Sequence, residues 1–498
     1  MYFQVKKAMK PVALASRLFI LVLLIGLSFP VRAQQIDTIL FEEVGAFEYS
    51  WVYSALAGQF DALGRPYLYS ANNELGMILY DVEDPSDLFP IDTFPNSLFG
   101  NLKVTNLFQE GQYLYLSLGG FPGAGQDVGL ATLDVTDPVS PVILDVWKSS
   151  TFSEGVAIVV IEGSYAYLGG MEEGLLILDV SDKENIAFVS HILPDPNWPQ
   201  PPGPFSVPNA RGMAIRGDLV FVCYDAGGLR VIDVTDKENP QEVSKYINTE
   251  MNDITQPAYN NIQLVGDYAY IGVDYCGLEV VDISDPLDIQ GVYWYNPWDC
   301  TPAIWSGNDG HVNELVKTPE EDLLFVSAGD TELMAFDLSD PALPKKVGEM
   351  AMLEDSAAVW GVRLHENYLV LSFIDNSGLW IPGLQPFYSD YGGIRIVEWQ
   401  RFPSSLEETP SSRFSLSISP NPASGISVLD FSLEEAAEVS VCVYNSVGQL
   451  QEVGIAGKLS AGVHQWPLDW TLYPSGIYLV QLLVAGEPVG ATRAVVGR

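Results

Sequence analysis

Acidic side chains recur along the chain in one fixed context, where they could serve either as catalytic carboxylates or as turn residues. An apolar run that ends in an acid and leads into a turn, such as LLILDVSDK at Leu175 and LRVIDVTDK at Leu229, occurs seven times. The acids of this repeat motif are Asp81, Asp134, Asp179, Asp233, Asp282, Asp337 and Glu398. Carboxylates spread over seven repeats cannot converge on one substrate, whereas Asp, Ser and Thr side chains bond nearby amides in tight turns. We therefore interpret these acids as turn residues.

The other residues with catalytic or metal-binding chemistry form no familiar motif. The four histidines, His191, His311, His365 and His464, include no two at metal-ligand spacing. HExxH, GxSxG, CxxC and EF-hand patterns are all absent from the sequence. The sequence thus predicts no metal site and no cofactor. An enzyme that assembles its site from scattered loop residues stays an alternative.

Aromatic residues gather in the long segments between and within the repeats. The candidate ligand-binding residues in or beside these segments are Trp198, Tyr259, Trp294, Trp298, Trp305, His311, Trp380 and Tyr388. Exposed aromatic clusters suit stacking on sugar rings or gripping a peptide. The alternative is that these side chains pack on one another and hold Pro-rich loops in place.

The repeats themselves define the elements that would position these residues. The motif acids are 45 to 61 residues apart, and each repeat reads as four short strands joined by Gly-containing turns. The middle strands are apolar at nearly every position, as expected when a sheet buries both faces against its neighbours. This pattern predicts an all-β fold, a seven-bladed β-propeller over residues 34–400.

The motif also resembles a known family. LLILD, LRVID and LEVVD are similar to the LVIVD repeat of bacterial cell-surface and secreted proteins. Because LVIVD repeats form β-propellers, the resemblance implies the same fold for this chain. The seventh copy departs from it, with Glu398 in place of Asp and no SDP after it. This last repeat lacks an outer strand, and we expect Asp37 to Phe47 to supply it and close the ring.

The first 33 residues are predicted to be a signal peptide. Lys6, Lys7, Lys10 and Arg17 precede the apolar run Leu18 to Phe29, whose 12 residues are too few for a transmembrane helix of about 20. We expect cleavage between Ala33 and Gln34, followed by export. No later stretch predicts a transmembrane segment.

A second domain is expected after a Pro/Ser-rich linker at 401–413. Residues 414–498 have alternating strands and turn residues, which predicts a small Ig-like β-sandwich. SPNPAS at Ser419, VYNSVGQL at Val443 and PSGIYLVQL at Pro474 together resemble the type A C-terminal sorting domain of the type IX secretion system. The resemblance implies that type IX machinery is a partner and that the protein reaches the outer-membrane surface or the medium of a Gram-negative bacterium by way of the periplasm.

Charge and cysteine content set further limits. With 24 Lys+Arg against 64 Asp+Glu, the net charge of -40 disfavours nucleic acid as a partner. Cys223 and Cys442 fall within predicted strands, as small buried side chains do. Cys276 and Cys300 fall in two connections on one face of the predicted propeller, so a disulfide between them is sterically sensible, although sequence does not determine the pairing.

Two functions of different classes fit these observations. The first is a secreted or surface-displayed, non-enzymatic module that binds a glycan, peptide or protein through its loop-rich face. The second is an extracellular hydrolase or lyase with acids at the mouth of the central channel, near His311, Asn313 and Glu314. The sequence does not name the extracellular ligand.

Overall fold

The computed structural model describes residues 38–496, apart from 50–53, 121–126, 203–206, 255–256, 299, 301–309, 330–331, 351–356, 376, 378–388, 403–415, 422, 424, 446–449, 472, 475 and 486. The described residues are mostly β-strand. They include the helix α1 (Thr249–Ile254) and the 3-10 turns η1 (Pro85–Asp87), η2 (Asn96–Phe99) and η3 (Asp274–Cys276). Within these ranges, no helix combines the length and apolarity needed to cross a membrane.

Strands β1 to β28 form seven antiparallel sheets of four strands each. Six of them follow the chain order: β2 (Ala55–Phe60), β3 (Tyr67–Asn72), β4 (Gly76–Asp81), β5 (Phe89–Phe94); β6 (Val104–Glu110), β7 (Tyr113–Leu118), β8 (Val128–Asp134), β9 (Val142–Ser149); β10 (Ile158–Glu162), β11 (Tyr165–Gly169), β12 (Leu175–Asp179), β13 (Ala187–Ile192); β14 (Met213–Arg216), β15 (Leu219–Cys223), β16 (Leu229–Asp233), β17 (Gln241–Tyr246); β18 (Tyr259–Val265), β19 (Tyr268–Val273), β20 (Gly277–Asp282), β21 (Gln290–Tyr295); β22 (Val312–Lys317), β23 (Leu323–Ala328), β24 (Leu333–Asp337), β25 (Lys345–Met350). The seventh sheet has the order β26 (Val359–His365), β27 (Tyr368–Phe373), β28 (Gly393–Phe402), β1 (Thr38–Glu48).

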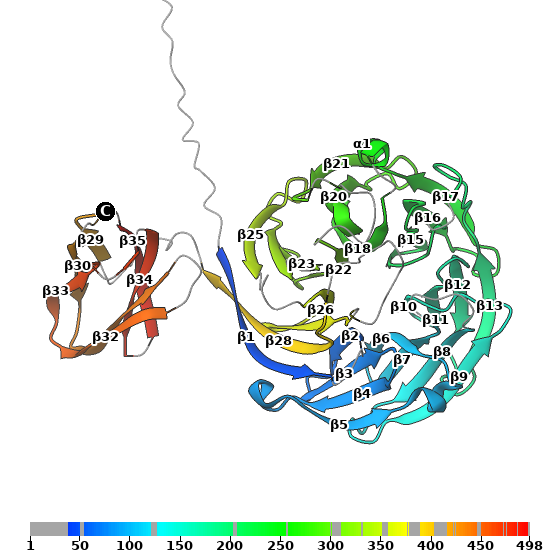
Figure 1. The fold of residues 1–498 in the computed structure, drawn as a ribbon, viewed down its shortest axis with the longest axis horizontal. Coiled ribbons are helices and arrows are strands. Elements are labelled where there is room, and N and C mark those ends of the chain that lie inside the picture. The colour runs from blue at the N-terminus through cyan, green and yellow to red at the C-terminus, as the bar shows by residue number, and fades with distance from the viewer. Residues whose placement is uncertain are drawn as a thin grey trace, which may run out of the picture. The chain divides into compact units, whose positions relative to one another are not determined.

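The seven sheets, or blades, follow one another around a common axis (Figure 1). The first strand of each blade lies nearest this axis, and the last strand lies on the outside. In the seventh blade the outside strand is β1, which pairs antiparallel with β28 from Thr38 opposite Phe402 to Glu48 opposite Gly393. The prediction that the N-terminal segment completes the last blade is confirmed.

The hydrophobic core is divided among the contacts between blades. Seven clusters of buried side chains each join two neighbouring blades, and the cluster around Ile78, Tyr80 and Ile394 joins the first blade to the seventh. Leu175 to Leu178 in β12 are all fully buried, because that strand faces a neighbour on both sides. This packing accounts for the nearly continuous apolar runs of the repeat motif.

The motif acids form the expected turns at the end of the third strand of each blade. The carboxylate accepts a hydrogen bond from the backbone N–H two residues further on at 2.9 Å for Asp81, 2.7 Å for Asp134 and 2.8 Å for Asp179, Asp233, Asp282 and Asp337. Hydrogen bonds from the side chain and the backbone of Ser181 hold the pKa of Asp179 below its usual value, and those from the backbone and the side chain of Thr235 do the same for Asp233. The seventh acid, Glu398, instead accepts a hydrogen bond from the Asn367 side chain at 2.7 Å. The turn interpretation is confirmed for the six Asp residues.

The C-terminal residues form two sheets with a core of their own. One sheet has the order β29 (Leu416–Ser419), β30 (Ile426–Leu433), β33 (Gly462–Asp469), and the other has the order β32 (Leu450–Leu459), β31 (Ala437–Tyr444), β34 (Gly476–Val484), β35 (Glu487–Val496). Phe431 and Leu468 of the first sheet and Val441 and Val480 of the second belong to one buried cluster. Cys442 is buried in β31 with a free thiol. An Ig-like topology stays a prediction.

Candidate ligand-binding site

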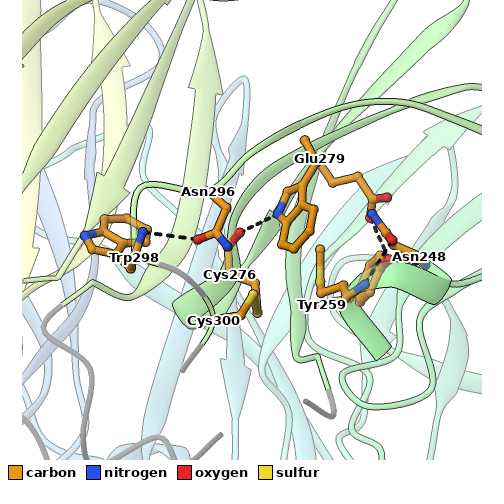
Figure 2. The surroundings of a disulfide bond; sticks show 9 residues. Asn248, Tyr259, Cys276, Glu279, Asn296, Trp298 and Cys300 are labelled. Atoms are coloured by element: carbon orange, nitrogen blue, oxygen red, sulfur yellow. Dashed lines mark hydrogen bonds between the residues drawn. A yellow bond between two sulfur atoms is a disulfide. The ribbon is translucent and has the colours of Figure 1, made fainter. Parts of the chain in front are cut away.

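Tyr259, one of the predicted contact residues, lies in the interior. Its hydroxyl donates to Glu279 Oε2 at 2.6 Å, and the Tyr246 hydroxyl donates to Oε1 at 2.8 Å. Figure 2 shows Tyr259, Glu279 and Asn248 gathered in one place. Burial raises the pKa of Glu279 to about 7, although the tyrosine hydrogen bonds oppose this shift. Tyr259 therefore supports a buried carboxyl group and is not presented to solvent.

Trp198 packs against cations of the fourth blade. The ring centroid lies 4.9 Å from the Arg230 guanidinium and 4.9 Å from the Lys245 ammonium. Arg230 is fully buried and also donates to the Trp198 carbonyl oxygen at 3.0 Å. These contacts hold the Pro-rich segment before β14 against the blade.

Trp294 and Trp298 are half-buried and also make contacts within the protein. The Trp294 indole N–H donates to the Cys276 carbonyl oxygen at 2.7 Å. The Trp298 ring covers Gly310 so closely that a Cβ atom there would lie 2.1 Å from it. Trp305, Trp380 and Tyr388, and the cleavage pair Ala33 and Gln34, lie outside the described residues.

A disulfide joins Cys276 to Cys300, whose Cα atoms are 4.6 Å apart (Figure 2). Cys276 ends the 3-10 turn η3 between the second and third strands of the fifth blade, and Cys300 lies in the connection to the sixth blade. The bond ties this long connection to the blade that it leaves.

His311 immediately precedes β22 and is fully buried. Its Nδ1 atom lies 2.5 Å from Asp274 Oδ1, and Asp274 is itself buried. The pair links η3 of the fifth blade to the first strand of the sixth. It therefore contributes to the contact between these blades.

A pocket of about 40 Å³ lies where the first strands of all seven blades begin. We call it the axial pocket, and its lining residues are Leu56, Thr105, Asn106, Ala157, Ile158, Arg211, Asn260, Asn261, Asn313, Glu314 and Trp360. Because the connections between blades lead directly into these strands, the pocket opens at the loop-rich end of the propeller. The motif turns lie at the opposite end, since neighbouring strands are antiparallel.

β-Bulges turn several of these side chains toward the axis. The pairing of the first strand with the second skips one residue in five blades. The extra residues are Leu56 in the first blade, Thr105 in the second, Asn260 in the fifth and Trp360 in the seventh. In the sixth blade, the register shift falls at Asn313 and Glu314. A bulge re-aims the side chain of a strand, and bulges are frequent next to functional sites.

Two asparagines present fixed amide donors to the axial pocket. Asn106 Oδ1 accepts from Leu107 N at 2.8 Å, and Asn261 Oδ1 accepts from Ile262 N at 2.9 Å. These bonds orient each side chain, and within the described residues neither Nδ2 group has a hydrogen-bond partner. Both donors are therefore available to a ligand.

Asn260 adds an acceptor. It is 3% exposed, and its Nδ2 group donates to Val312 O at 3.0 Å and to Asn313 Oδ1 at 3.1 Å. Its Oδ1 atom is buried and has no partner among the described residues. A buried acceptor without a partner costs about 1 to 3 kcal/mol, so a bound water or ligand hydroxyl would be favoured here.

Glu314 is the one carboxylate among the lining residues, and it is already engaged. Its Oε2 atom accepts from Arg363 Nη1 at 2.5 Å and from Val362 N at 3.0 Å. The described residues contain no group of three or more His, Cys, Asp or Glu side chains that could hold a metal ion. The pocket is thus equipped for hydrogen bonding rather than for acid–base chemistry by two carboxylates.

Arg211 and Trp360 face each other from the fourth and seventh blades. The guanidinium lies 5.8 Å from the Trp360 ring centroid. Burial raises the pKa of Asp225 to about 6, and attraction to Arg211 opposes the shift. The positive charge of Arg211 therefore has the Asp225 carboxyl group as a nearby counter-charge.

Asn313 and Glu314 were predicted to lie near the mouth of the central channel, whereas the other axial residues were not predicted. A signal was present, because VTNL at Val104, YNNI at Tyr259 and VNEL at Val312 each place asparagine inside an apolar run at the start of a first strand. Polar residues at the same point of several repeats indicate a shared surface. The turn acids, which are more regular, masked this pattern.

Comparisons with known proteins agree with the fold. Residues 156–193, 209–248 and 259–290 match the LVIVD repeat. A crystal structure of RRP9 WD40 repeats aligns with 72% of this chain and 100% of its own, at 9% identity and a TM-score of 0.52. A structure of U3-55K aligns with 72% and 98%, at 10% identity and a TM-score of 0.50. No curated protein matches the chain.

The chain is therefore an all-β repeat protein of the propeller type. Its third, fourth and fifth blades carry the matched LVIVD repeats. At such low identity the likeness to WD40 structures extends to the fold alone.

Proposed function

We propose that the protein is a non-enzymatic binding module whose ligand enters the axial pocket. The observation that carries this proposal is the convergence of uncommitted amide groups from separate blades. Asn106 of the second blade and Asn261 of the fifth have oriented, unpaired donors, and Asn260 has an unpaired acceptor. Convergent polar groups in a concave site are typical of ligand recognition.

The test replaces a donor without disturbing the bulge. Asn106→Asp and Asn261→Asp keep the Oδ1 atom that accepts from the next backbone N–H but remove the NH2 group. Purified protein would be screened against arrays of oligosaccharides, peptides and extracellular proteins, and each hit would be titrated by calorimetry. We expect both variants to weaken binding by about tenfold or more. Asn185→Asp, on an exposed motif turn at the other end, is the matched control and should bind normally.

A hydrolase or lyase is the second candidate, and the buried Asp274–His311 pair favours it. An enzyme would convert the bound probe, which mass spectrometry of the mixture after long incubation would detect. His311→Gln should abolish that conversion in a protein that still folds. Recovery of every bound probe unchanged would contradict the enzymatic candidate, and conversion would contradict the binding module.

We further propose that the protein is exported in two stages. Residues 1–33 would direct it to the periplasm, with cleavage between Ala33 and Gln34. After the linker 401–413, residues 414–498 would act as an Ig-like type A sorting domain that engages the type IX machinery. The SPNPAS, VYNSVGQL and PSGIYLVQL segments support this assignment, as does the separate core of the two C-terminal sheets. The protein would then act in the medium or on the outer-membrane surface.

A further inference from the structure

We infer that the axial pocket takes a hydroxyl-bearing end of a neutral glycan. This inference rests on the proposed binding function and names the ligand class. Three features support it: the hydrogen-bond donors and the acceptor in the pocket, the charge of the protein, and the size of the pocket.

The pocket needs a group that both donates and accepts hydrogen bonds. The Nδ2 groups of Asn106 and Asn261 require an acceptor, whereas the buried Oδ1 of Asn260 requires a donor. A carboxylate or phosphate ester only accepts, and an ammonium group only donates, so each would leave part of the pocket unsatisfied. A hydroxyl group does both, and neighbouring sugar hydroxyls can serve several of these groups together.

The charge of the protein disfavours an anionic ligand. The formal net charge is -40, so the long-range field repels anions. Close to the axis, Glu314 is paired with Arg363, and Arg211 has Asp225 beside it. Among the lining residues, then, the one cation has an anion beside it, and a neutral ligand avoids the long-range repulsion.

The size of the pocket limits how deeply a ligand can enter. A volume of about 40 Å³ accommodates a few water molecules but not a sugar ring. Only the hydroxyl-bearing edge of a terminal sugar can therefore enter and displace that water. The half-buried Trp360 ring, with the Arg211 guanidinium 5.8 Å from its centroid, forms part of the lining beside this entry point.

A peptide is the competing ligand, because its backbone also donates and accepts. The side chains of an extended peptide point to alternate sides of its backbone, so a peptide would have to place both backbone groups and a side chain in a volume of about 40 Å³. The structure thus favours the glycan, and the experiment includes peptides as a separate arm.

The experiment compares three probe panels on the full mature chain. The first contains oligosaccharides ending in glucose, galactose, mannose or N-acetylglucosamine. The second contains the same chains ending in a uronic acid, and the third contains peptides. We expect binding in the first panel, a loss of about tenfold or more in Asn106→Asp and in Asn261→Asp, and no change in Asn185→Asp. Melting curves identify any variant that fails to fold, in which case Trp360→Phe replaces it.

Deoxy analogues of the best neutral probe supply a second measurement that needs no variant. Removing one hydroxyl of the terminal sugar should lower affinity by about tenfold or more, whereas removing one from an internal sugar should not. Binding of only the uronic acid or peptide panel, lost in the same variants, would overturn the ligand class and keep the binding function. Binding that survives every pocket variant would overturn the assignment of the site. No binding in any panel would overturn the binding function itself.

Discussion

Glu279 should make the stability of the propeller depend on pH. It is a buried carboxyl group that accepts hydrogen bonds from Tyr246 and Tyr259, and burial raises its pKa from the ordinary 4.5 to about 7. For an acid whose pKa is raised on folding, the stabilisation is fully present below the unfolded pKa. It is lost as pH rises from there through the folded pKa, because the unfolded chain then releases the proton more easily.

The size of the effect follows from the shift. Each pKa unit corresponds to about 1.4 kcal/mol, so a shift between these two values changes the free energy of unfolding by about 3 kcal/mol. Glu279→Gln removes the ionisation and resembles the protonated side chain in shape. We expect the free energy of unfolding of Glu279→Gln, measured relative to that of the natural protein, to rise by about 3 kcal/mol from pH 4 to pH 8.

Urea unfolding of both proteins at a series of pH values measures this difference. Glu184→Gln, at an exposed turn, is the control and should follow the natural protein throughout. Tyr246→Phe removes one hydrogen bond to the carboxylate and should move the transition to higher pH. A stability difference between Glu279→Gln and the natural protein that does not vary with pH would refute the reasoning.

Three further predictions concern export, closure and packing. Deleting residues 414–498 should leave a folded protein in the periplasm, and its appearance in the medium or on the surface would disprove the sorting assignment. Deleting residues 37–48 exposes the edge of β28 and should cause aggregation detectable by light scattering, and a monomer of unchanged stability would contradict the closure role of β1. Lys183→Ala should lower the free energy of unfolding by about 1 kcal/mol, since Nζ donates to a backbone carbonyl and lies 5.3 Å from the Tyr115 ring. Urea unfolding would measure this loss against Glu184→Ala, and equal stability of the two variants would count against it.

The arrangement of strands could be predicted because the repeats make it locally visible. The four apolar residues before Asp179 specify a strand buried on both faces, and the acid specifies the turn after it. Both signals depend on neighbours in sequence. The closing strand could be predicted too, since a repeat that stops after its third strand at Phe402 leaves one edge for another segment.

The contacts of the aromatic side chains could not be predicted in the same way. Trp198 packs on Arg230, an arginine within an otherwise apolar repeat motif, and the two are far apart in sequence. The sequence predicts that Tyr259 lies in a loop, yet it begins β18 and donates to Glu279 two strands away. Such pairings depend on the positions of whole strands, which hydrophobic patterns do not specify.

The axial pocket illustrates how a repeat protein can vary one surface while keeping its core. The clusters between blades need similar apolar residues at the same position in every repeat. The extra residue of a bulge lies outside the regular pairing of the strands, and here Leu56, Thr105, Asn260 and Trp360 occupy equivalent bulges. Because the first strands converge on the axis, four such positions meet in one pocket. Substitutions at these bulges should therefore change the lining of the pocket while leaving the apolar pattern of the repeat motif intact.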